Sequence, residues 1–382
     1  MIVRKLEGNN VVVVVSAMGH STDELIKLAR SVSENPPDRE MDMLLSSGER
    51  ISMALLSMCI QSLGHDSISL TGSQAEIITD TAHRRARITG VKATRVRKEI
   101  ENGRIVIVAG FQGISNAREI TTLGRGGSDT TAVALAAALK ADICEILTDV
   151  PGVFTADPRI VPNARKLDEI CFEEMLELAS MGAKVLQSRS VELASKFNVV
   201  IKVGLAHVNS PGTIIKKEDS SMEEMLVRGI AHNLDEVKFT VHRIPDKPGV
   251  AAAIFSMLAE RGVNVDMIIQ NISADGFTDL SFTVNTEDIE KATSLSDLLM
   301  KQVGAERVTY DENIAKVSVV GVGMRSHTGV ANKVFNTLAQ NRININMIST
   351  SEIKISVVIA RDRAEEAVRA LHEAFELDKT SA

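Results

Sequence analysis

The segment Thr121-Thr-Leu-Gly-Arg-Gly-Gly-Ser-Asp-Thr-Thr-Ala132 carries more information about the fold than any other stretch of this chain. Glycines at positions 124, 126 and 127 let backbone N–H groups approach an anion, because they lack a Cβ atom. The Ala- and Leu-rich run Ala132–Lys140 that follows favours an α-helix. A glycine-rich loop that opens onto a helix N-terminus binds phosphate or carboxylate groups, so we predict such a site here.

An ordinary helix start is the alternative interpretation of this segment, with Ser128 or Asp129 as the N-cap residue. Arg125 favours the anion site, because a guanidinium group binds a carboxylate through two hydrogen bonds and has no role in capping. No Lys follows the glycines, so the spacing is not that of a Walker A loop, and it does not fit a Rossmann dinucleotide-binding loop either.

Short β-branched runs alternate along the first half of the chain with segments of helical period such as Asp42–Leu63 and Phe172–Ser180. Continuous apolar strands are buried on both faces, as in a parallel sheet that helices cover. The strands expected on this basis are Val11–Val15, Ile105–Val108, Cys144–Leu147 and Val199–Val203. We therefore predict a three-layer α/β/α domain with a mainly parallel sheet over residues 1–220, which ends in the polar run Lys216–Ser221.

Composition narrows the class of ligand. The 382 residues carry a formal net charge of -7, no Trp and one Tyr, which argues against a nucleic-acid surface and leaves small anions as ligands. The apolar run Val11–Val15 is too short to span a membrane, and no targeting segment is visible. Cys59, Cys144 and Cys171 are scattered among apolar neighbours, so we expect buried free thiols and a cytoplasmic location.

An internal repeat occupies the second half of the chain. The segment that begins Gly249-Val-Ala-Ala-Ala-Ile-Phe returns 80 residues later as Gly329-Val-Ala-Asn-Lys-Val-Phe, and Val263-Asn-Val-Asp-Met-Ile268 returns as Ile343-Asn-Ile-Asn-Met-Ile348. The apolar residues of the first part of each copy lie on one face of a helix. Gly262 and Asn341 tolerate left-handed backbone and are expected to end the two helices.

Each copy combines a strand, a tight turn, a helix and a second strand, followed by a further strand at Leu280–Val284 or Ile353–Ile359. A period of 80 residues suits paired modules better than a solenoid. We therefore predict two ferredoxin-like βαββαβ modules, over residues 221–310 and 311–382.

Together these motifs resemble the aspartate kinases, and the duplicated C-terminal part resembles the paired ACT domains of that family. The resemblance rests on the Arg125 loop and on five further segments: Ser16-Ala-Met-Gly19, Leu45-Ser-Ser-Gly-Glu-Arg50, Gly110-Phe-Gln-Gly113, Thr148–Arg159 and Met181-Gly-Ala-Lys-Val-Leu186. It implies ATP-dependent phosphorylation of the side-chain carboxylate of L-aspartate, the first step toward lysine, threonine and methionine. Such a transfer brings anions together, so backbone amides and cations must offset their repulsion.

The resemblance also implies roles for particular residues at the acceptor site. Arg125, Gly126 and Ser128 are expected to hold the α-carboxylate of aspartate, Glu49 to accept its ammonium group and Thr22 to contact the same ligand. Asp129 and Arg125 are the residues implied in catalysis, with Asp129 organising the transfer.

Around the nucleotide the resemblance places Thr148, Asp149, Phe154, Arg159 and Lys184. The family commonly has Tyr where Phe154 stands, so ring packing is kept and a hydroxyl contact is lost. From the residues alone, Phe154 would be a core residue and Asp157-Pro158-Arg159 a solvated turn. Mg²⁺ is expected to arrive with ATP, because the sequence has no His/Cys ligand cluster.

ACT modules imply amino-acid sensing, with lysine, threonine or both as effectors. The positions that match effector sites are Asp246, Lys247, Gly249, Val250, Gln270 and Asn271 in the first copy, and Asn344 and Ile345 in the second. A plain turn at Asp246-Lys-Pro-Gly249 is the alternative. The resemblance further implies a homo-oligomer formed through these modules, and a C-terminal subunit translated from Met222 or Met225 is a further hypothesis.

The chain departs from the family at its start. It lacks the Lys-x-Gly-Gly strand and part of the first helix with which aspartate kinases begin, and that loop supplies groups to the transferring phosphate. We expect the natural enzyme to be longer, with the start set too late. The alternatives are a regulatory amino-acid-binding subunit with impaired catalysis and another amino-acid kinase, specific for glutamate or acetylglutamate.

Overall fold

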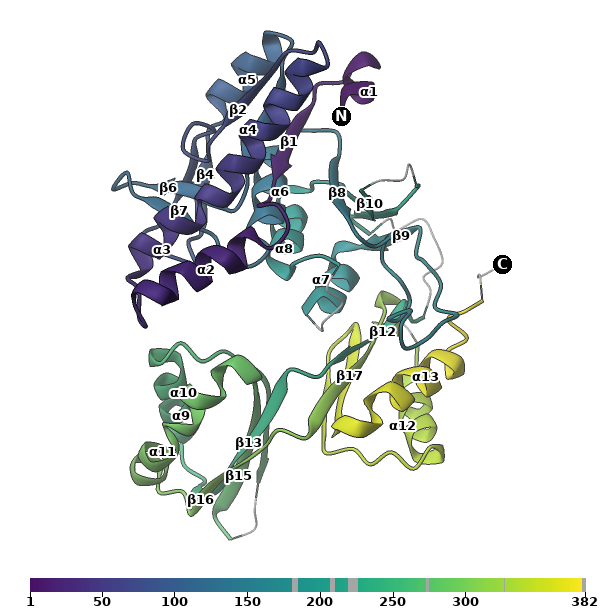
Figure 1. Cartoon of the computed structure of the whole chain (residues 1–382). Coiled ribbons are helices and arrows are strands. Elements are labelled where there is room, and N and C mark those ends of the chain that lie inside the picture. The colour runs from purple at the N-terminus through teal and green to yellow at the C-terminus, as the bar shows by residue number, and fades with distance from the viewer. Residues whose placement is uncertain (181–184, 207–209, 219–225, 273–274, 326, 380–382) are drawn as a thin grey trace. The chain divides into compact units, whose positions relative to one another are not determined.

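In the computed structural model the described residues are 1–180, 185–206, 210–218, 226–272, 275–325 and 327–379. They divide into two compact units, each built from more than one stretch of chain (Figure 1). The first unit comprises 1–153, 167–179 and 184–220, and the second comprises 154–166, 180–183 and 221–382. The boundary expected at 220 falls on residues outside the described ranges.

Parallel pairing dominates the central sheets of the first unit. One sheet has the order β1-β5-β2 with both pairings parallel, and the other has the order β8-β10-β11-β9 with a single antiparallel pairing, β10 with β11. The bounds are β1 Val12–Val15, β2 Ser67–Leu70, β5 Ile105–Ala109, β8 Cys144–Thr148, β9 Glu169–Cys171, β10 Ile201–Leu205 and β11 Thr213–Lys216. The mainly parallel sheet is confirmed, with each expected strand found within about two residues.

Helices cover both faces of the β1-β5-β2 sheet. Ile105 and Ile107 of β5 pack against α4, whereas Val106 and Val108 face α5 and α6 on the other side. Burial on both faces explains the continuous apolar run, since each fully buried aliphatic side chain contributes about 1.5–3 kcal/mol. The helices of this unit are α1 Ile2–Leu6, α2 Ser21–Val32, α3 Asp38–Leu45, α4 Ser47–Ser62, α5 Thr94–Glu101, α6 Gly127–Leu139, α7 Phe172–Ser180 and α8 Ser188–Phe197.

A third, smaller sheet of the first unit has the order β4-β3-β6-β7. Its strands are β3 Ile77–Thr79, β4 Ile88–Val91, β6 Gln112–Ser115 and β7 Ile120–Thr122. The last of these strands leads directly into the glycine-rich loop. This sheet therefore positions the segment that the sequence singled out.

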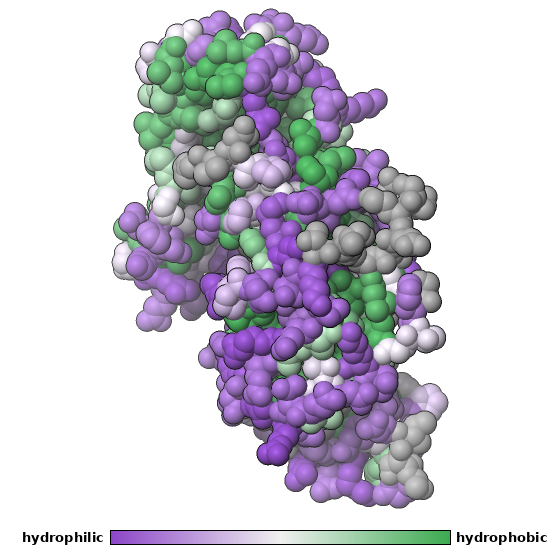
Figure 2. Space-filling model, turned by 90° about the vertical axis from the view of Figure 1, so that its right-hand side faces the viewer, coloured by the Kyte–Doolittle hydropathy of each residue, from purple (hydrophilic) through white to green (hydrophobic). Residues whose placement is uncertain are grey.

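The helical segment expected over Asp42–Leu63 is divided between α3 and α4 at Ser46. Among the described residues, Asp38–Ser62 is the single helical stretch long and apolar enough to cross a membrane by length and composition. Met41, Met53 and Ile60 of this stretch are buried, whereas Met43, Ile51, Leu55 and Met58 are exposed. Figure 2 shows hydrophilic residues over much of the second unit on the face drawn, and apolar residues gathered on part of the first.

Two four-stranded antiparallel sheets with helices form the second unit. The first has the order β14-β15-β13-β16 and the second has the order β12-β17-β19-β18. The strands are β12 Gly229–Asn233, β13 Glu236–Pro245, β14 Val265–Ile272, β15 Phe277–Asn285, β16 Arg307–Asp311, β17 Ile314–Val320, β18 Met347–Thr350 and β19 Lys354–Ala360. The helices are α9 Val250–Glu260, α10 Ile289–Thr293, α11 Ser296–Val303, α12 Val330–Gln340 and α13 Ala364–Ala374. The element order of the first copy, βαββαβ with its second helix split, is the predicted one.

The second module borrows a strand from an earlier part of the chain. β12 precedes the first module in sequence, yet it pairs antiparallel with β17 of the second, Gly229 opposite Val320. The range 221–310, expected to hold the first module alone, thus contains one strand of the second. Residues Phe154–Lys166 also belong to this unit, where Ala156 and Val161 pack in the core of the second module.

Two local expectations are only partly correct. The helices end where expected, with α9 ending at Glu260 and Asn341 capping α12. Gly262 has the expected left-handed φ of 67°, but Asn341 has φ −87°, and the left-handed residue of the second copy is Arg342 with φ 54°. Arg342 is the position 80 residues after Gly262, so backbone geometry is kept although the residue type is not. Cys144 and Cys171 are buried free thiols as predicted, whereas Cys59 is exposed because it lies on the outer side of α4.

Candidate active site

The carboxyl ends of β1 and β5 lie at the same edge of their sheet, because the two strands are parallel. The Gly110 N–H donates to the Val15 carbonyl at 2.9 Å. A Cβ atom on Gly110 would lie 2.7 Å from Oγ of Ser128 and 2.9 Å from the Val15 carbonyl oxygen. Glycine at 110 is therefore what allows the start of α6 to lie directly against this edge.

The loop before α6 depends on its glycines. Gly124 has φ 79° and Gly126 has φ 67°, the left-handed region that glycine adopts without strain. A Cβ atom on Gly126 would lie 1.8 Å from Cγ of Gln187, and one on Gly127 would lie 2.9 Å from the ring of Phe111. The backbone is thus held close to its neighbours, and only glycine fits at either position.

The helix start is confirmed, but its cap is not the one considered from sequence. α6 begins at Gly127 with Gly126 as the N-cap, so Ser128 and Asp129 lie inside the first turn. The backbone N–H groups of the first turn have no acceptor within the helix and carry the positive end of its dipole. Arg125, in the loop just before, is exposed. This arrangement can bind an anion.

Glu49 lies in the first turn of α4 and is buried, with 4 % of its surface exposed. Its Oε1 accepts a hydrogen bond from the Ala17 N–H at 3.1 Å, in the loop that follows β1. Among the described residues its other oxygen, Oε2, is buried and has no hydrogen-bond partner. Burial raises the pKa of Glu49, and hydrogen bonds from its own N–H and that of Ala17 oppose the rise. A buried carboxylate oxygen without a partner is costly, and a cationic ligand group could pair with it.

Asp129 is more than half withdrawn from solvent, and burial raises its pKa to about 6. The buried Cys144 of β8 lies within its electrostatic reach: burial, with the charges of Asp129 and Glu145, raises the pKa of that thiol to about 12. A perturbed carboxyl group at a helix N-terminus is typical of functional sites. Thr22, the second residue of α2, is half-buried.

The residues that hold the glycine-rich loop in place were not predicted from the sequence. Asp42 of α3 is fully buried, and its carboxylate accepts from Thr122 Oγ1 at 2.5 Å and from the Arg84 N–H at 3.0 Å, with Nδ1 of His83 2.6 Å away. Arg189 of α8 donates to the Leu123 carbonyl at 2.8 Å and to the Ala86 carbonyl at 2.7 Å. A buried Asp in a helix of apolar period was the available signal, since such a group needs partners.

The residues expected around the nucleotide are divided between the two units. Thr148 ends β8 and donates to Asp149 Oδ1 at 3.0 Å, in the first unit. Phe154 and Arg159 belong to the second, in a segment where Arg159 Nη2 lies 2.6 Å from Asp157 Oδ2. Phe154 is half-buried, and Asp157–Arg159 includes the solvated turn considered from sequence. Lys184 lies outside the described residues.

The expected effector positions lie on the turn before α9 and on β14. Asp246, Lys247 and Gly249 are exposed and Val250 is half-buried, while Gln270 and Asn271 are exposed near the end of β14. The turn at Asp246–Gly249 is confirmed, with φ 95° at Gly249. In the second copy, Asn344 is exposed and Ile345 packs against the core of the second module.

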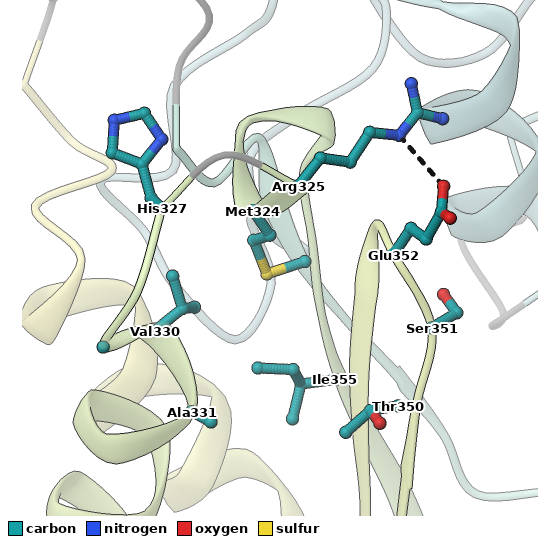
Figure 3. Close-up of a pocket in the computed structure, with 10 residues that line it drawn as sticks. Met324, Arg325, His327, Val330, Ala331, Thr350, Ser351, Glu352 and Ile355 are labelled. Carbon is teal, nitrogen blue, oxygen red and sulfur yellow. Dashed lines mark ion pairs between the residues drawn. The ribbon is translucent and has the colours of Figure 1, made fainter.

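The second module holds a cavity of about 490 Å³ between the start of α12 and the end of β18 (Figure 3). Its lining includes Gly329, Val330, Thr350 and Ser351, each 80 residues after an effector position expected in the first copy. Arg325 Nε and Glu352 Oε2 form an ion pair of 3.6 Å at the rim, and His327 Nδ1 lies 2.8 Å from the Gly323 carbonyl. Asn344 and Ile345 are not among the lining residues. The cavity has the size of a small-molecule site and both charged and apolar walls.

Family models match both halves of the chain. The amino acid kinase family model matches residues 1–204, and ACT domain models match residues 240–295 and 317–375. The aspartokinase of Mycolicibacterium smegmatis is 55% identical over 378 residues, which is 98% of this chain and 90% of that protein.

Two solved structures of E. coli aspartokinase III are similar to this chain. The complex with aspartate and ADP, in the R-state, has a TM-score of 0.78 at 28% identity. The complex with lysine and aspartate, in the T-state, has a TM-score of 0.71 at 29% identity. Each match covers 92% of this chain and 79% of the other.

Proposed function

This chain belongs to the aspartokinase family, and we propose that it transfers the γ-phosphoryl group of ATP to the side-chain carboxylate of L-aspartate, forming 4-phospho-L-aspartate. This is the first step of lysine, threonine and methionine biosynthesis. We assign the transfer to the kinase domain over residues 1–220 and amino-acid sensing to the modules over 221–310 and 311–382. The second module is completed by β12 and by residues 154–166 from these earlier ranges. A cytoplasmic location fits the three free cysteines.

The observation that carries the acceptor site is the unpartnered, buried oxygen of Glu49, as seen among the described residues. An aspartate ammonium group beside Oε2 would supply the missing partner and would restore the charged form that burial disfavours. Arg125 would pair with the α-carboxylate through its two-pronged guanidinium group. Gly126 and Ser128 would bring the loop and the first turn of α6 to the same carboxylate, and Thr22 of α2 completes the proposed set.

Transfer requires the acceptor carboxylate to approach an anionic phosphate group. The acceptor is already ionised at neutral pH, so positioning and charge stabilisation supply the catalysis. The positive N-terminus of α6 offsets the negative charge, and such groups act strongly because they are fixed beforehand. Asp129, in the same turn, is proposed to organise the transfer.

For the nucleotide we propose Thr148 and Asp149 at the end of β8, Phe154 and Arg159 in the following segment, and Lys184 by resemblance alone. Arg159 can exchange Asp157 for a phosphate group, because its side chain is 85% exposed. Mg²⁺ would enter as MgATP, its charge shared among the phosphate oxygens.

We propose that the ACT modules bind lysine, threonine or both, and that the chain forms a homo-oligomer through them. The lysine complex of the E. coli relative supports an amino-acid effector. The cavity beside α12 offers carboxylate, guanidinium and imidazole groups over an apolar floor, a combination suited to a free amino acid. A C-terminal subunit started at Met222 or Met225 stays a hypothesis, since both lie outside the described residues.

Acceptor competition tests the proposed function. The chain is incubated with MgATP and either aspartate or glutamate, and the acyl phosphate is trapped as the hydroxamate while ADP is measured. We expect turnover with aspartate and little with glutamate. Arg125→Ala should raise the KM for aspartate by at least about tenfold, since a charge-assisted pair is lost, with a smaller change for ATP. Arg95→Ala, an exposed arginine of α5, is the matched control. Preference for glutamate, or an unchanged aspartate KM in Arg125→Ala, would contradict the proposal.

A further inference from the structure

Glu236 and Lys316 form a buried ion pair between the two modules of the second unit. Glu236 begins β13 and Lys316 lies in β17, and these strands are in contact (Figure 1). Lys316 Nζ lies 2.8 Å from Glu236 Oε1, with side-chain exposures of 3% and 5%. Asp266 of β14 also pairs with Lys316, and Asn233 donates to the same oxygen of Glu236 at 3.0 Å.

The two charged residues occupy equivalent positions of the internal repeat. Residues 236 and 316 are 80 apart, the same offset that separates Gly249 from Gly329. Met267 and Met347 are equivalent in the same way, and both are buried in one cluster with Ile314 and Val358. The modules therefore meet through corresponding residues, so the shape of this face also allows a module to meet a second copy of itself.

The opposite charges of Glu236 and Lys316 make the two module faces different. In a pairing of first module with first module, a buried carboxylate would face a carboxylate, and in a pairing of second with second an ammonium group would face an ammonium group. Like charges without partners in a buried site are strongly unfavourable. Only the pairing of unlike modules places each charge beside its opposite.

Stability alone is a weak explanation for such a pair, because apolar residues of similar volume often stabilise a protein as well or better. Selection between similar partners is the better-supported role of a buried polar group at a self-complementary face. We propose that Glu236 and Lys316 form a recognition surface by which each module accepts the unlike module and rejects a second copy of itself. This inference is independent of the proposed kinase activity.

Three variants of the full chain test the inference. Lys316→Glu places like charges together. The exchange variant Glu236→Lys/Lys316→Glu/Asp266→Asn restores opposite charges in reverse order. The apolar variant Glu236→Met/Lys316→Met removes the charges and keeps the volume. Lys238→Glu, on the same strand β13 but only half-buried, is the control for a change of net charge. Particle mass is measured by light scattering over a dilution series, and protection of β13 and β17 by hydrogen exchange.

We expect Lys316→Glu to raise exchange in β13 and β17 by about tenfold or more, with the wild-type pattern in Lys238→Glu. The exchange variant should recover both the wild-type protection and the wild-type mass. The apolar variant should stay folded but form additional, concentration-dependent species, because like modules can now pair. An apolar variant with a single wild-type mass, or an exchange variant no better than Lys316→Glu, would overturn the inference.

Discussion

The hydroxyl of Thr155 lies 2.9 Å from Nε2 of His372, and both side chains are buried. The same hydroxyl accepts the Arg165 N–H at 3.0 Å, and the Thr155 carbonyl accepts the Ile230 N–H at 2.7 Å. Residues 154–166 are thereby fixed to α13 and β12 of the second unit. This segment carries Phe154 and Arg159, two of the residues proposed for the nucleotide, so contacts within the second unit hold their backbone.

Replacing Thr155 with Val should weaken this connection. The change removes the hydroxyl that contacts Nε2 of His372 and accepts the Arg165 N–H, and a buried polar group that loses its hydrogen bond costs about 1–3 kcal/mol. We expect a lower unfolding temperature and a KM that rises more for ATP than for aspartate. Thr309→Val is the matched control, because it removes a 2.9 Å contact with His242 that is exposed. Equal effects of the two substitutions would refute a special role for Thr155.

The second unit should lose stability on acidification. Burial lowers the pKa of His372, and the charge of Asp378 opposes this; burial likewise lowers the pKa of His232. Both residues therefore bind protons less readily in the folded state than in the unfolded state, whose pKa is about 6.5. Their contribution to the free energy of unfolding is fully present above that pH and is lost as the pH falls below it. Chemical denaturation between pH 5 and 8, about the range in which His titrates, should show this slope, and His372→Gln should reduce it.

Asp129 should lower the stability of the folded chain at neutral pH, although the proposed function needs this residue. Its folded pKa of about 6 lies above the ordinary value of 3.8, so the folded state binds the proton more tightly. Unfolding free energy therefore falls as the pH rises from about 4 to 6, and the penalty persists above 6. Asp129→Asn should stabilise the first unit at pH 8 by up to about 2 kcal/mol while it lowers kcat. A destabilised variant with wild-type kcat would rule out both parts of this prediction.

Much of the fold follows from the sequence because burial imposes a pattern. The continuous apolar run of β5 predicted a strand covered on both faces, and its alternate residues do contact helices on opposite sides. The repeat predicted two similar modules, and Gly249 and Gly329 start their helices with nearly identical φ values of 95° and 96°.

The pairing of β12 with the second module could not be predicted from the sequence. Its sequence, Gly229–Asn233, is a short strand that either module could accept, and the choice depends on long-range packing against β17. Arg342 could not be predicted either. Its backbone is left-handed, a conformation that Gly or Asn usually adopts, and packing of the surrounding chain holds it there. Motifs led to the charged and glycine residues of the proposed site, which stay predictions. The partners of Asp42 had no such signal, because they lie about 40 and 80 residues away in the chain.

Asp42 and Arg189 should act as positioning residues for Arg125. Asp42→Asn replaces an acceptor of several hydrogen bonds with an amide whose NH₂ group cannot accept from Thr122 or Arg84. We expect the KM for aspartate to rise about tenfold, with a smaller effect on ATP. Asp38→Asn, on the same helix but exposed, is the control. Arg189→Lys should act similarly, since Lys cannot span two carbonyl groups as Arg does. Unchanged acceptor KM in both variants would show that the loop keeps its conformation without them.

Filling the cavity of the second module should reveal which copy senses the effector. Thr350 lies at the end of β18 and lines the cavity, and Gln270 is its equivalent in the first module. Phe at either position occupies the space that a free amino acid would need, because the aromatic ring is far larger than the side chain it replaces. Inhibition by lysine and by threonine is measured as the concentration that halves the rate, with calorimetry to count bound effector molecules. If the cavity is an effector site, Thr350→Phe raises the half-inhibitory concentration by about tenfold or more and lowers the number of effector molecules bound. Gln270→Phe makes the same change at the equivalent position of the first module. If Thr350→Phe leaves inhibition and stoichiometry unchanged, the cavity is not an effector site and the sensing role passes to the first module.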